Sequence, residues 1–470
     1  MDVLSPLDGQ VLTTIAKGTT ADMESAIASA RAAFDDRLWA GQPSAARKKV
    51  LLKWADLIES NALELAVLGV RDNGTEIGMA IKAEPGSAAG TIRYYAEALD
   101  KVYGEIAPTQ SDVLGLIHKE PVGVVGAIIP WNFPLMIGAW KLGPALAMGN
   151  SVVLKPAETA SLSLMRMVEL AHEAGLPPGV LNAVTGEGAV VGEAMGLSMD
   201  VDVLVFTGSG GTGRRLMEYS ARSNMKRVYL ELGGKSPNII FADAPDLDEA
   251  AKVAAHGIFR NAGQVCVAGS RLLVEASIHD EFVTNVAEVA KGMQVGHPLD
   301  PKTEIGPLVT EEHFNKVTSY FDIAREDGAT VAAGGTTLGD EGYFIRPTLF
   351  TNANNQMRIA QEEIFGPVLT SIPFATEDEA LSIANDIPYG LTGYVWTNDL
   401  TRALRFTDRL EAGMIWVNSE NVRHLPTPFG GIKASGIGRD GGDWSFEFYM
   451  EQKHIGFATG QHKITKLGAL

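Results

Sequence analysis

Cysteine is almost absent from this sequence, because Cys266 is the only one among 470 residues. A single thiol excludes an intramolecular disulfide and any metal cage built from several cysteines. We therefore predict no metal site. The same scarcity is typical of a protein from a reducing compartment.

Basic residues are also few, with 39 Lys and Arg against 57 Asp and Glu and a net charge of −18. Because binding to nucleic acid depends on clustered Lys and Arg, we expect no nucleic-acid partner. Hydrophobic residues make up 46% of the chain and charged residues 20%. This balance indicates a globular protein with a sizeable core, and the length predicts about three domains at roughly 150 residues each.

A membrane-spanning segment is not expected either. The uncharged run from Pro121 to Trp140 approaches the required length, but Pro130, Asn132 and Pro134 interrupt it. A lipid-exposed helix broken there would leave backbone groups unpaired, so we predict a strand, a loop and a helix instead. The first residues, MDVLSPLDGQ, resemble neither a signal peptide nor a basic transit peptide. We expect a cytoplasmic protein without a membrane partner.

Short apolar segments alternate with helical patterns along most of the chain. Such alternation predicts an α/β fold with doubly wound parallel sheets, which bind ligands at the carboxyl ends of their strands. The predicted strands lie within 114–130, 150–156, 201–206, 227–232, 270–275, 366–374 and 414–418, and the predicted helices within 21–33, 45–68, 88–99, 161–174, 213–221, 246–257, 278–291, 311–326, 377–385 and 401–410.

Cys266 lies among small residues in the segment FRNAGQVCVAGSR. A lone buried cysteine is usually an inert small hydrophobic residue. Here the Gly- and Ala-rich surroundings leave room for a substrate carbon to reach the sulfur, and a thiolate is a strong nucleophile. No histidine stands beside it, so the pattern is not typical of a Cys–His hydrolase. We interpret Cys266 as a candidate nucleophile.

Glu231 ends a β-rich run in the segment YLELGGKSPN, just before Gly233 and Gly234. An ion-paired strand end would explain its position. A carboxylate beside such a turn is also well placed to act as a general base on water, especially where burial raises its pKa. The residues by themselves leave both interpretations open.

Two further segments have the pattern of a nucleotide site. The glycines of FTGSGGTG, residues 206–213, follow a strand and open a helix, where free N–H groups can bind an anion. The spacing differs from the ordinary GxGxxG motif. Lys155 ends another strand and Glu158 follows three residues later, a pair that can bind ribose or phosphate, although such pairs are more often solvated surface pairs.

These segments belong to a longer ordered set that resembles the aldehyde dehydrogenase superfamily. Because the set covers most of the chain, the resemblance is specific to this superfamily. It comprises PWNFP (130–134), KPAE (155–158), FTGSGGTG (206–213), ELGGK (231–235), GQVC (263–266), EEIFGP (362–367) and PFGGIKASGIGR (428–439).

The resemblance implies a role for each matching residue. Cys266 would attack the aldehyde carbon to form a thiohemiacetal, and Asn132 with the Cys266 backbone N–H would stabilise the oxyanion. Hydride transfer to NAD would leave a thioester, and Glu231 would activate the water that hydrolyses it. The expected cofactor-binding residues are Trp131, Lys155, Glu158, Gly208, Ser209, Gly213, Glu363 and Phe365; the expected substrate-tunnel aromatics are Phe133, Trp140 and Phe429, for which core packing is an equally good explanation.

NAD is the expected cofactor, and NADP is less favoured. A carboxylate at Glu158 would accept the ribose 2′-hydroxyl but would repel a 2′-phosphate.

The family fold also predicts the domain organisation. A Rossmann-type dinucleotide-binding domain would comprise residues 1–103 and 123–233, and a related α/β catalytic domain residues 234–447. A small β-extension, residues 104–122 and 448–470, would mediate oligomerisation into a homodimer or homotetramer.

Two rival functions share this fold. A CoA-acylating relative would keep Cys266 but have little use for a water-activating carboxylate, so Glu231 argues against it. A catalytically silent structural or binding protein would not need Cys266, Glu231 and Asn132 together.

The aldehyde is the least constrained prediction. Much of the first 400 residues resembles dehydrogenases of γ-glutamyl-aminobutyraldehyde and similar aliphatic aldehydes. The segment ENVRHLPTPFGG, 420–431, instead resembles the 5-carboxymethyl-2-hydroxymuconate and 2-hydroxymuconic semialdehyde group, in which an Arg matching Arg423 grips a carboxylate. A surface Arg would explain Arg423 equally well, and the group's second Arg is missing at Pro85–Gly86. We predict a semialdehyde with a carboxylate or a ring from a degradative pathway; uncharged aliphatic or aromatic aldehydes and aminoaldehydes are the alternative.

Overall fold

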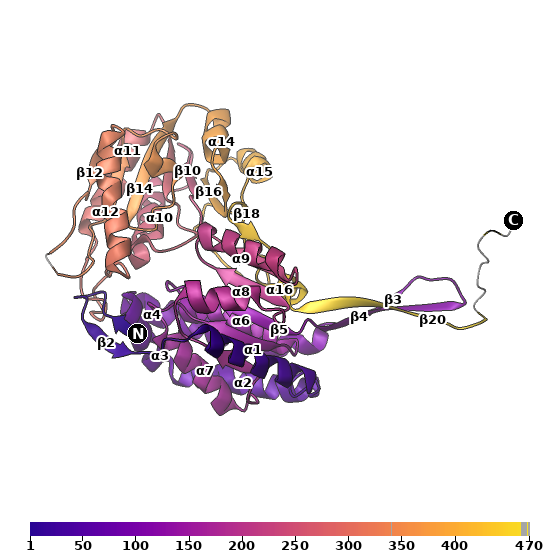
Figure 1. Ribbon diagram of the computed structural model, residues 1–470. Coiled ribbons are helices and arrows are strands. Elements are labelled where there is room, and N and C mark those ends of the chain that lie inside the picture. Colours follow the sequence, from indigo (N-terminus) through magenta and orange to yellow (C-terminus); the bar gives the residue numbers. More distant parts are fainter. Residues whose placement is uncertain (340, 462–467, 469–470) are drawn as a thin grey trace.

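The computed structural model describes residues 1–339, 341–461 and 468. Two α/β lobes face each other, and a long β-sheet projects from one of them (Figure 1). Each lobe is built on its own sheet of mostly parallel strands, and one continuous hydrophobic core extends through both lobes.

The sheet of the first lobe has six strands in the order β19-β9-β8-β5-β6-β7. Its strands are parallel except for β19, which pairs antiparallel at one edge. The order reverses between β5 and β8, so the loops that follow these two strands open into one crevice. The strands are β5 (Val124–Ile128), β6 (Ser151–Lys155), β7 (Leu181–Ala183), β8 (Val203–Thr207), β9 (Arg227–Glu231) and β19 (Gly436–Ile437).

Helices cover both faces of this sheet. Because both faces are covered, β5, β6 and β8 are buried along their whole length and consist mostly of apolar residues. One face carries α1 (Thr20–Asp35), a π-helical turn (Gly188–Gly192), α8 (Glu193–Leu197) and α9 (Gly210–Arg222). The other carries α2 (Ser44–Ser60), α5 (Pro85–Ala98), α6 (Pro134–Ala147) and α7 (Leu162–Ala174), with α3 (Ala62–Asn73), α4 (Ile77–Ala83) and the turn η1 (Leu99–Lys101) connecting them.

The sheet of the second lobe has seven strands in the order β12-β13-β14-β11-β10-β16-β17, all parallel except β12. They are β10 (Pro237–Ile240), β11 (Arg271–Glu275), β12 (Thr330–Ala333), β13 (Thr348–Thr351), β14 (Val368–Phe374), β16 (Thr392–Trp396) and β17 (Met414–Val417). The helices of this lobe are α10 (Leu247–Phe259), the turn η3 (Arg260–Gly263), α11 (His279–Gly292), α12 (Glu311–Glu326), α13 (Arg358–Gln361), α14 (Glu377–Asn385) and α15 (Leu400–Arg409).

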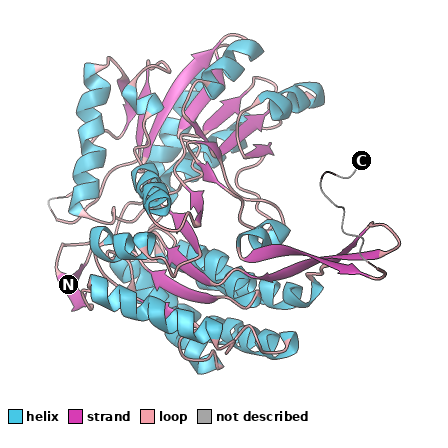
Figure 2. Cartoon of the chain, turned by 45° about the vertical axis from the view of Figure 1, so that its right-hand side comes forward, coloured by secondary structure: helices cyan, strands magenta, loops and turns pink. Residues whose placement is uncertain are grey.

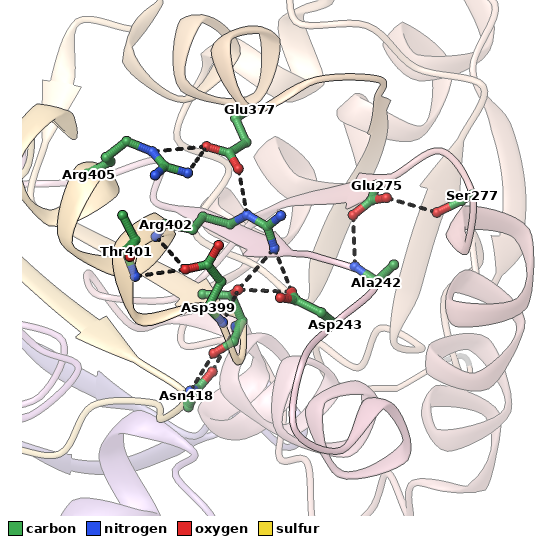
Figure 3. A network of polar contacts seen from close by, with 11 residues as sticks. Ala242, Asp243, Glu275, Ser277, Glu377, Asp399, Thr401, Arg402, Arg405 and Asn418 are labelled. Atoms are coloured by element: carbon green, nitrogen blue, oxygen red, sulfur yellow. Dashed lines mark hydrogen bonds and ion pairs between the residues drawn. The ribbon is translucent and has the colours of Figure 1, made fainter.

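An ion-pair network ties α14 and α15 to the end of this sheet (Figure 3). The Arg402 guanidinium donates to Glu377 at 2.8 Å and to Asp243, in the loop after β10, at 2.7 Å. It also lies 4.4 Å from the ring centre of Phe241. Arg405 adds a second bond to Glu377. One arginine therefore joins two helices and the loop after a central strand.

The projecting sheet consists of three antiparallel strands in the order β20-β4-β3 (Figure 2). They are β3 (Glu105–Ala107), β4 (Val113–Pro121) and β20 (Met450–Ala458), and β4 and β20 pair over nine residues each. The helix α16 (Gly442–Phe448) leads into β20. Two small sheets pair β1 (Asp2–Leu4) with β2 (Val11–Thr14) and β15 (Tyr389–Gly390) with β18 (Ile432–Lys433).

The predicted α/β fold class is confirmed. The helical segment predicted over 45–68 is two helices, because α2 ends at Ser60 and the Asn61 side chain donates to the carbonyl of Leu57. Within the described ranges, no helix is both long and apolar enough to cross a bilayer. Of the predicted oligomerisation extension, residues 462–467 and 469–470 lie outside the described residues.

Candidate active site

Three of the predicted site residues, Asn132, Glu231 and Cys266, line a single cavity of about 220 Å³. They come from three different segments: the loop between β5 and α6, the carboxyl end of β9, and the loop after η3. The cavity therefore lies where the carboxyl end of the first sheet meets the second lobe.

The loop that carries Cys266 begins with an unusual backbone turn. Asn261, Ala262 and Gly263 have φ values of 49°, 50° and 73°, which lie in the left-handed region. Gly263 is required there, since a Cβ atom would overlap the carbonyl of Gly366. Ala262 adopts this conformation at an energetic cost, so the surrounding contacts must hold the turn.

The side chain of Asn132 is tied to the same loop. Its amide donates to the carbonyl of Gln264 at 2.9 Å, and the residue is 4% exposed. A primary amide has a second N–H. Among the described residues this second N–H has no acceptor, and Asn132 and Cys266 line the same cavity, so it can donate to a negatively charged oxygen bound there.

Glu231 is buried with no hydrogen-bond partner for either carboxylate oxygen among the described residues. Burial, with the negative charges of Asp440 and Glu363 in support, raises its pKa to about 8; the Lys141 and Arg423 cations oppose this rise. The two glycines after Leu232 permit close packing, because a Cβ at Gly233 would overlap the Glu363 carboxylate. An unpartnered carboxylate with a pKa near neutrality is suited to accept a proton from water.

Burial raises the pKa of the Cys266 thiol well above its usual value, and the carboxylates of Glu231 and Glu363 raise it further. The backbone N–H groups of Val267 and Cys266 act in the opposite direction. The thiol and the Glu231 carboxyl therefore each disfavour ionisation of the other. A base or an added positive charge is needed to form the thiolate.

An ion pair that the sequence did not reveal lies next to Glu231. Lys141 Nζ and Asp440 Oδ2 are 2.5 Å apart, and both side chains are almost fully buried. Lys141 lowers and Asp440 raises the pKa of Glu231. The one signal for Lys141 was a single charge in the otherwise apolar helix α6.

A second cavity, of about 530 Å³, continues from the first along the carboxyl edge of the sheet. Lys155, Glu158, Gly208 and Ser209, four of the residues expected to bind the cofactor, line it. Lys155 Nζ donates to Glu158 Oε2 at 2.8 Å. Although burial raises it, the pKa of Glu158 is lowered overall by the Lys155 charge and hydrogen bonds.

The donors around this cleft fit a dinucleotide. A Cβ atom at Gly188 would meet no atom within 4 Å, so this wall leaves space for a ligand. Ser209 caps α9 by accepting the N–H of Thr212, and the helix N-terminus offers further N–H groups to an anion. Gly213 is placed differently: it is buried against Leu232 and is not among the residues lining the cavity.

Glu363, Phe365 and Trp131 gather at the junction of the two cavities. Glu363 accepts the N–H of Gly234 at 2.9 Å, and Trp131 packs edge-on against Phe365 with ring centres 5.5 Å apart. His313, which no sequence signal indicated, binds the Phe365 carbonyl at 2.7 Å. Burial lowers the pKa of His313 to about 4, so this ring is neutral.

Arg423 packs against the predicted tunnel residues Trp140 and Phe429, whose ring centres are 4.9 Å apart. The guanidinium carbon lies 3.5 Å from the ring centre of Trp140 and 4.4 Å from that of Phe429. Among the described residues, Arg423 Nη2 is buried and has no partner. Burial lowers the pKa of Arg423 to about 10, and the side chain is not a solvated surface group. Phe133 is buried in the main hydrophobic core.

A dinucleotide-type cleft that leads to a partly buried thiol and a buried carboxylate defines an oxidoreductase of the two-lobed α/β class. The model of the "Aldehyde dehydrogenase family" matches residues 1–455. The NADP/NAD-dependent aldehyde dehydrogenase PuuC of Escherichia coli is 47% identical over 454 residues, which are 97% of this chain and 91% of PuuC. The chain therefore belongs to the aldehyde dehydrogenase family, which oxidises aldehydes to carboxylic acids.

Solved structures agree with this assignment. The aldehyde dehydrogenase KauB of Pseudomonas aeruginosa is 50% identical, with a TM-score of 0.96 over 97% of this chain and 93% of KauB. The P. syringae indole-3-acetaldehyde dehydrogenase AldA, solved with NAD⁺, is 49% identical with the same TM-score and the same coverage.

Proposed function

We propose that this protein is an NAD-dependent dehydrogenase of an aldehyde that carries a carboxylate, and that Cys266, Asn132 and Glu231 perform the chemistry. The convergence of these three side chains on one cavity carries the proposal. No other described residue lining that cavity is a thiol.

In the first step, the Cys266 thiol releases its proton to solvent in the cleft, the thiolate Sγ bonds to the aldehyde carbon, and the carbonyl oxygen becomes negatively charged. The Asn132 amide and the Cys266 backbone N–H donate to this oxygen, and one such donor is typically worth about 3 kcal/mol in the transition state. NAD, when bound, would supply the acceptor for the hydride of the same carbon. Cys266 then holds an acyl group as a thioester.

In the second step, Glu231 removes a proton from water, which attacks the thioester. Its two unpartnered oxygens and its pKa of about 8 support this role, because an ion-paired carboxylate would be a poor base. The carbon–sulfur bond then breaks and the acid is released, and the leaving thiolate takes the proton from Glu231, which restores the Cys266 thiol and the carboxylate.

We propose Lys155 and Glu158 as the ribose-binding pair and Gly208 and Ser209 as part of the pyrophosphate turn. Glu363, Phe365 and Trp131 would bind the nicotinamide half. For Gly213 we propose an indirect role: it lets α9 approach the end of β9 closely. NAD is preferred in this proposal because ionised Glu158 repels a 2′-phosphate.

The proposed substrate class rests on Arg423. A guanidinium packed against two aromatic rings, with a buried N–H that has no partner among the described residues, is incompletely satisfied, and a carboxylate would supply the missing acceptor. Arg423 is also close enough to Glu231 and Cys266 for their charges to affect its pKa. A semialdehyde with a carboxylate at its far end would reach from Cys266 to Arg423.

An aldehyde panel tests this substrate class. Succinic and hydroxymuconic-type semialdehydes are compared with uncharged aliphatic aldehydes, aromatic aldehydes and aminoaldehydes. We expect Arg423→Met, which keeps a long side chain against the rings, to lower kcat/KM for carboxylated aldehydes about 10- to 100-fold, since a charged hydrogen bond contributes about 1.5–3 kcal/mol. A uniform effect on all aldehydes would show that Arg423 does not bind the carboxylate, and a wild-type preference for uncharged aldehydes would contradict the proposed substrate class.

The covalent step is tested through the only thiol. Cys266→Ala should abolish turnover and retain NAD binding, and alkylation of one site per chain should inactivate the wild type. Mixing wild-type enzyme, NAD and aldehyde without CoA should release NADH. Activity that persists after complete alkylation contradicts the nucleophile.

The projecting sheet supports a proposal about assembly. Tyr103, Ile106 and Phe457 on or beside it are more than half exposed, and within the described ranges nothing pairs with the free edge of β20. We propose that residues 104–122 and 448–470 join subunits into a homodimer or homotetramer, and that residues 1–103 with 123–233, and residues 234–447, form the cofactor and catalytic domains. The strand β19 lies in the range 234–447 but pairs with β9 of the cofactor domain.

A cytoplasmic location is also proposed, since the reactive thiol must stay reduced.

A further inference from the structure

The segment from Asn73 to Glu76 connects α3 to α4 and is buried deep in the protein. Asn73, Thr75 and Glu76 are 3%, 2% and 5% exposed. Gly74 ends α3 with φ 82°, and a Cβ atom there would press against Pro307. None of the four residues lines either cavity. Asn73, Thr75 and Glu76 are therefore buried polar residues that do not contact either cavity.

One end of the segment binds the loop that carries Asn132. Asn73 Nδ2 donates to the carbonyl of Trp131 at 3.2 Å. Asn73 Oδ1 accepts the N–H of Thr75 at 2.9 Å, which fixes the orientation of the Asn73 amide. The residue directly before Asn132 is thus held by this segment.

The other end binds the loop that carries Cys266. The Thr75 hydroxyl donates to Asn261 Oδ1 at 2.9 Å, and Glu76 Oε1 accepts the Asn261 N–H at 3.0 Å. Asn261 Nδ2 donates at 3.4 Å to the Gln264 carbonyl, the same oxygen that accepts the Asn132 amide. Gln264 in turn donates to the Asn261 carbonyl at 3.1 Å.

These contacts converge on the strained turn before the nucleophile. Asn261 and Ala262 are both left-handed, and left-handed backbone is unfavourable for a residue with a Cβ atom unless neighbours stabilise it. Thr75 and Glu76 bind the first residue of this turn from outside the loop. The turn sets the direction of the Gln264 carbonyl and so the position of the Asn132 amide.

We propose that Thr75 is a positioning residue for the oxidation: through Asn261 it holds the turn that aligns the Asn132 amide and the Cys266 N–H toward the oxyanion. This inference rests on the proposed roles of Cys266 and Asn132. It predicts that loss of the Thr75 hydroxyl slows the step in which a carbonyl oxygen gains charge. A reaction of the same thiol that creates no oxyanion is affected much less.

The test compares two reactions of Cys266 in Thr75→Val, which has the same shape as the wild type but no hydroxyl. The rate of the pre-steady-state NADH burst reports acylation, and the rate of alkylation by iodoacetamide reports the thiol itself. We expect the burst rate to fall at least about 10-fold, because a buried acceptor is left unpaired and the donors are misplaced. The alkylation rate and the affinity for NAD should stay close to wild type, and Thr75→Ser should restore the burst.

Two further variants separate positioning from loss of stability. Thr370→Val removes another fully buried hydroxyl, bonded to the carbonyl of Ile359, and should leave the burst rate unchanged. Asn261→Gly keeps the left-handed backbone but removes the side chain that Thr75 binds. If Thr75 acts through Asn261, the double variant Thr75→Val/Asn261→Gly should acylate no more slowly than Asn261→Gly.

Equal slowing of alkylation and acylation, no slowing of either, or additive effects in the double variant would overturn the proposal. If Thr75→Val does not fold, Asn261→Gly and Thr75→Ser still decide it: the first should slow acylation selectively and the second should not. A burst that survives in Cys266→Ala would instead refute the proposed function. A burst lost in Cys266→Ala but normal in Thr75→Val refutes only the positioning role.

Discussion

At the scale of single residues, the reactive groups are kept neutral by their surroundings. Burial raises the pKa of both Glu231 and Cys266, and each negative charge would raise the other. Two neighbouring groups whose pKa values are both raised cannot both be negatively charged near pH 7 unless a base or a positive charge is added. The Lys141–Asp440 pair adds one charge of each sign beside them and so has little net effect on that balance.

The first prediction concerns the pH dependence of deacylation. Since the pKa of Glu231 is raised to about 8, the protonated form predominates below pH 8 and the base form above it. Thioester hydrolysis should therefore accelerate as the pH rises through 8 and then level off. Stopped-flow measurement of the steady phase after the NADH burst tests this.

Glu231→Gln is the control for that profile. It should retain the burst, because acylation does not need the water-activating base, and lose the pH-dependent steady phase. Loss of the burst itself would show that Glu231 acts on the thiol.

The second prediction concerns cofactor choice. Glu158→Gln removes the charge that we propose to face the ribose, and it should lower the ratio of kcat/KM with NAD to kcat/KM with NADP by about 10-fold, since a like-charge contact costs more than the 1.4 kcal/mol that this factor represents. Glu187 directly precedes Gly188, which lines the second cavity, and forms an ion pair with Lys17. Glu187→Gln is therefore a matched control. An unchanged ratio in Glu158→Gln would count against its ribose role.

At the scale of elements, the parallel strands position the site residues at their carboxyl ends, and polar networks fix the helices that surround them. The loops after β5 and β8 and the end of β9 all reach the same edge of one sheet, where Asn132, Ser209 and Glu231 lie. On the second lobe, α14 and α15 are fastened by the arginine network described above (Figure 3). Neither Arg402 nor Arg405 lines the two cavities.

The third prediction separates the two arginines of that network. Arg402→Ala loses two ion pairs and the stacking on Phe241, and should lower the free energy of unfolding by about 1–2 kcal/mol. Arg405→Ala loses only the more exposed contact to Glu377 and should cost less than about 0.5 kcal/mol. Urea unfolding or melting temperature measures the difference, and kcat should be unchanged in both. If both substitutions lowered the free energy of unfolding by the same amount, Arg402 would stabilise the lobe no more than Arg405 does.

At the scale of the whole molecule, two lobes enclose the chemistry and the third sheet extends away from it (Figures 1 and 2). In the described part of the chain this sheet extends beyond the helices, and Ile106 and Phe457 are more than half exposed. We propose that a second copy of the chain covers these side chains.

The fourth prediction tests that assembly. Phe457 is 51% exposed on β20, and Phe457→Asp should shift the protein toward the monomer, as measured by light scattering after size-exclusion chromatography. Leu404, which is 60% exposed on α15 in the second lobe, provides the control Leu404→Asp. An equal mass for all three proteins would place the interface elsewhere.

The sequence by itself determined the α/β class, the strand ends at Lys155 and Glu231, and the membership of Asn132, Glu231 and Cys266 in one site. Apolar runs and glycine turns are local patterns, so they predict where a strand ends and which polar residue follows it. The order of the motifs, through the resemblance to the family, then indicated which strand ends and loops contribute to the same site. The break at Asn61 escaped prediction because a continuous helical pattern does not show where a polar side chain ends the first helix.

Tertiary structure alone decided the rest. Lys141 and Asp440 are 299 residues apart, and no local pattern predicts that they are paired in the core. The packing of Arg423 against Trp140 and Phe429 depends likewise on how distant segments pack, and so does the contact of Thr75 with Asn261 across 186 residues. Burial and charge at these places follow from contacts between distant segments, and the pKa values of Glu231 and Cys266 follow from them in turn.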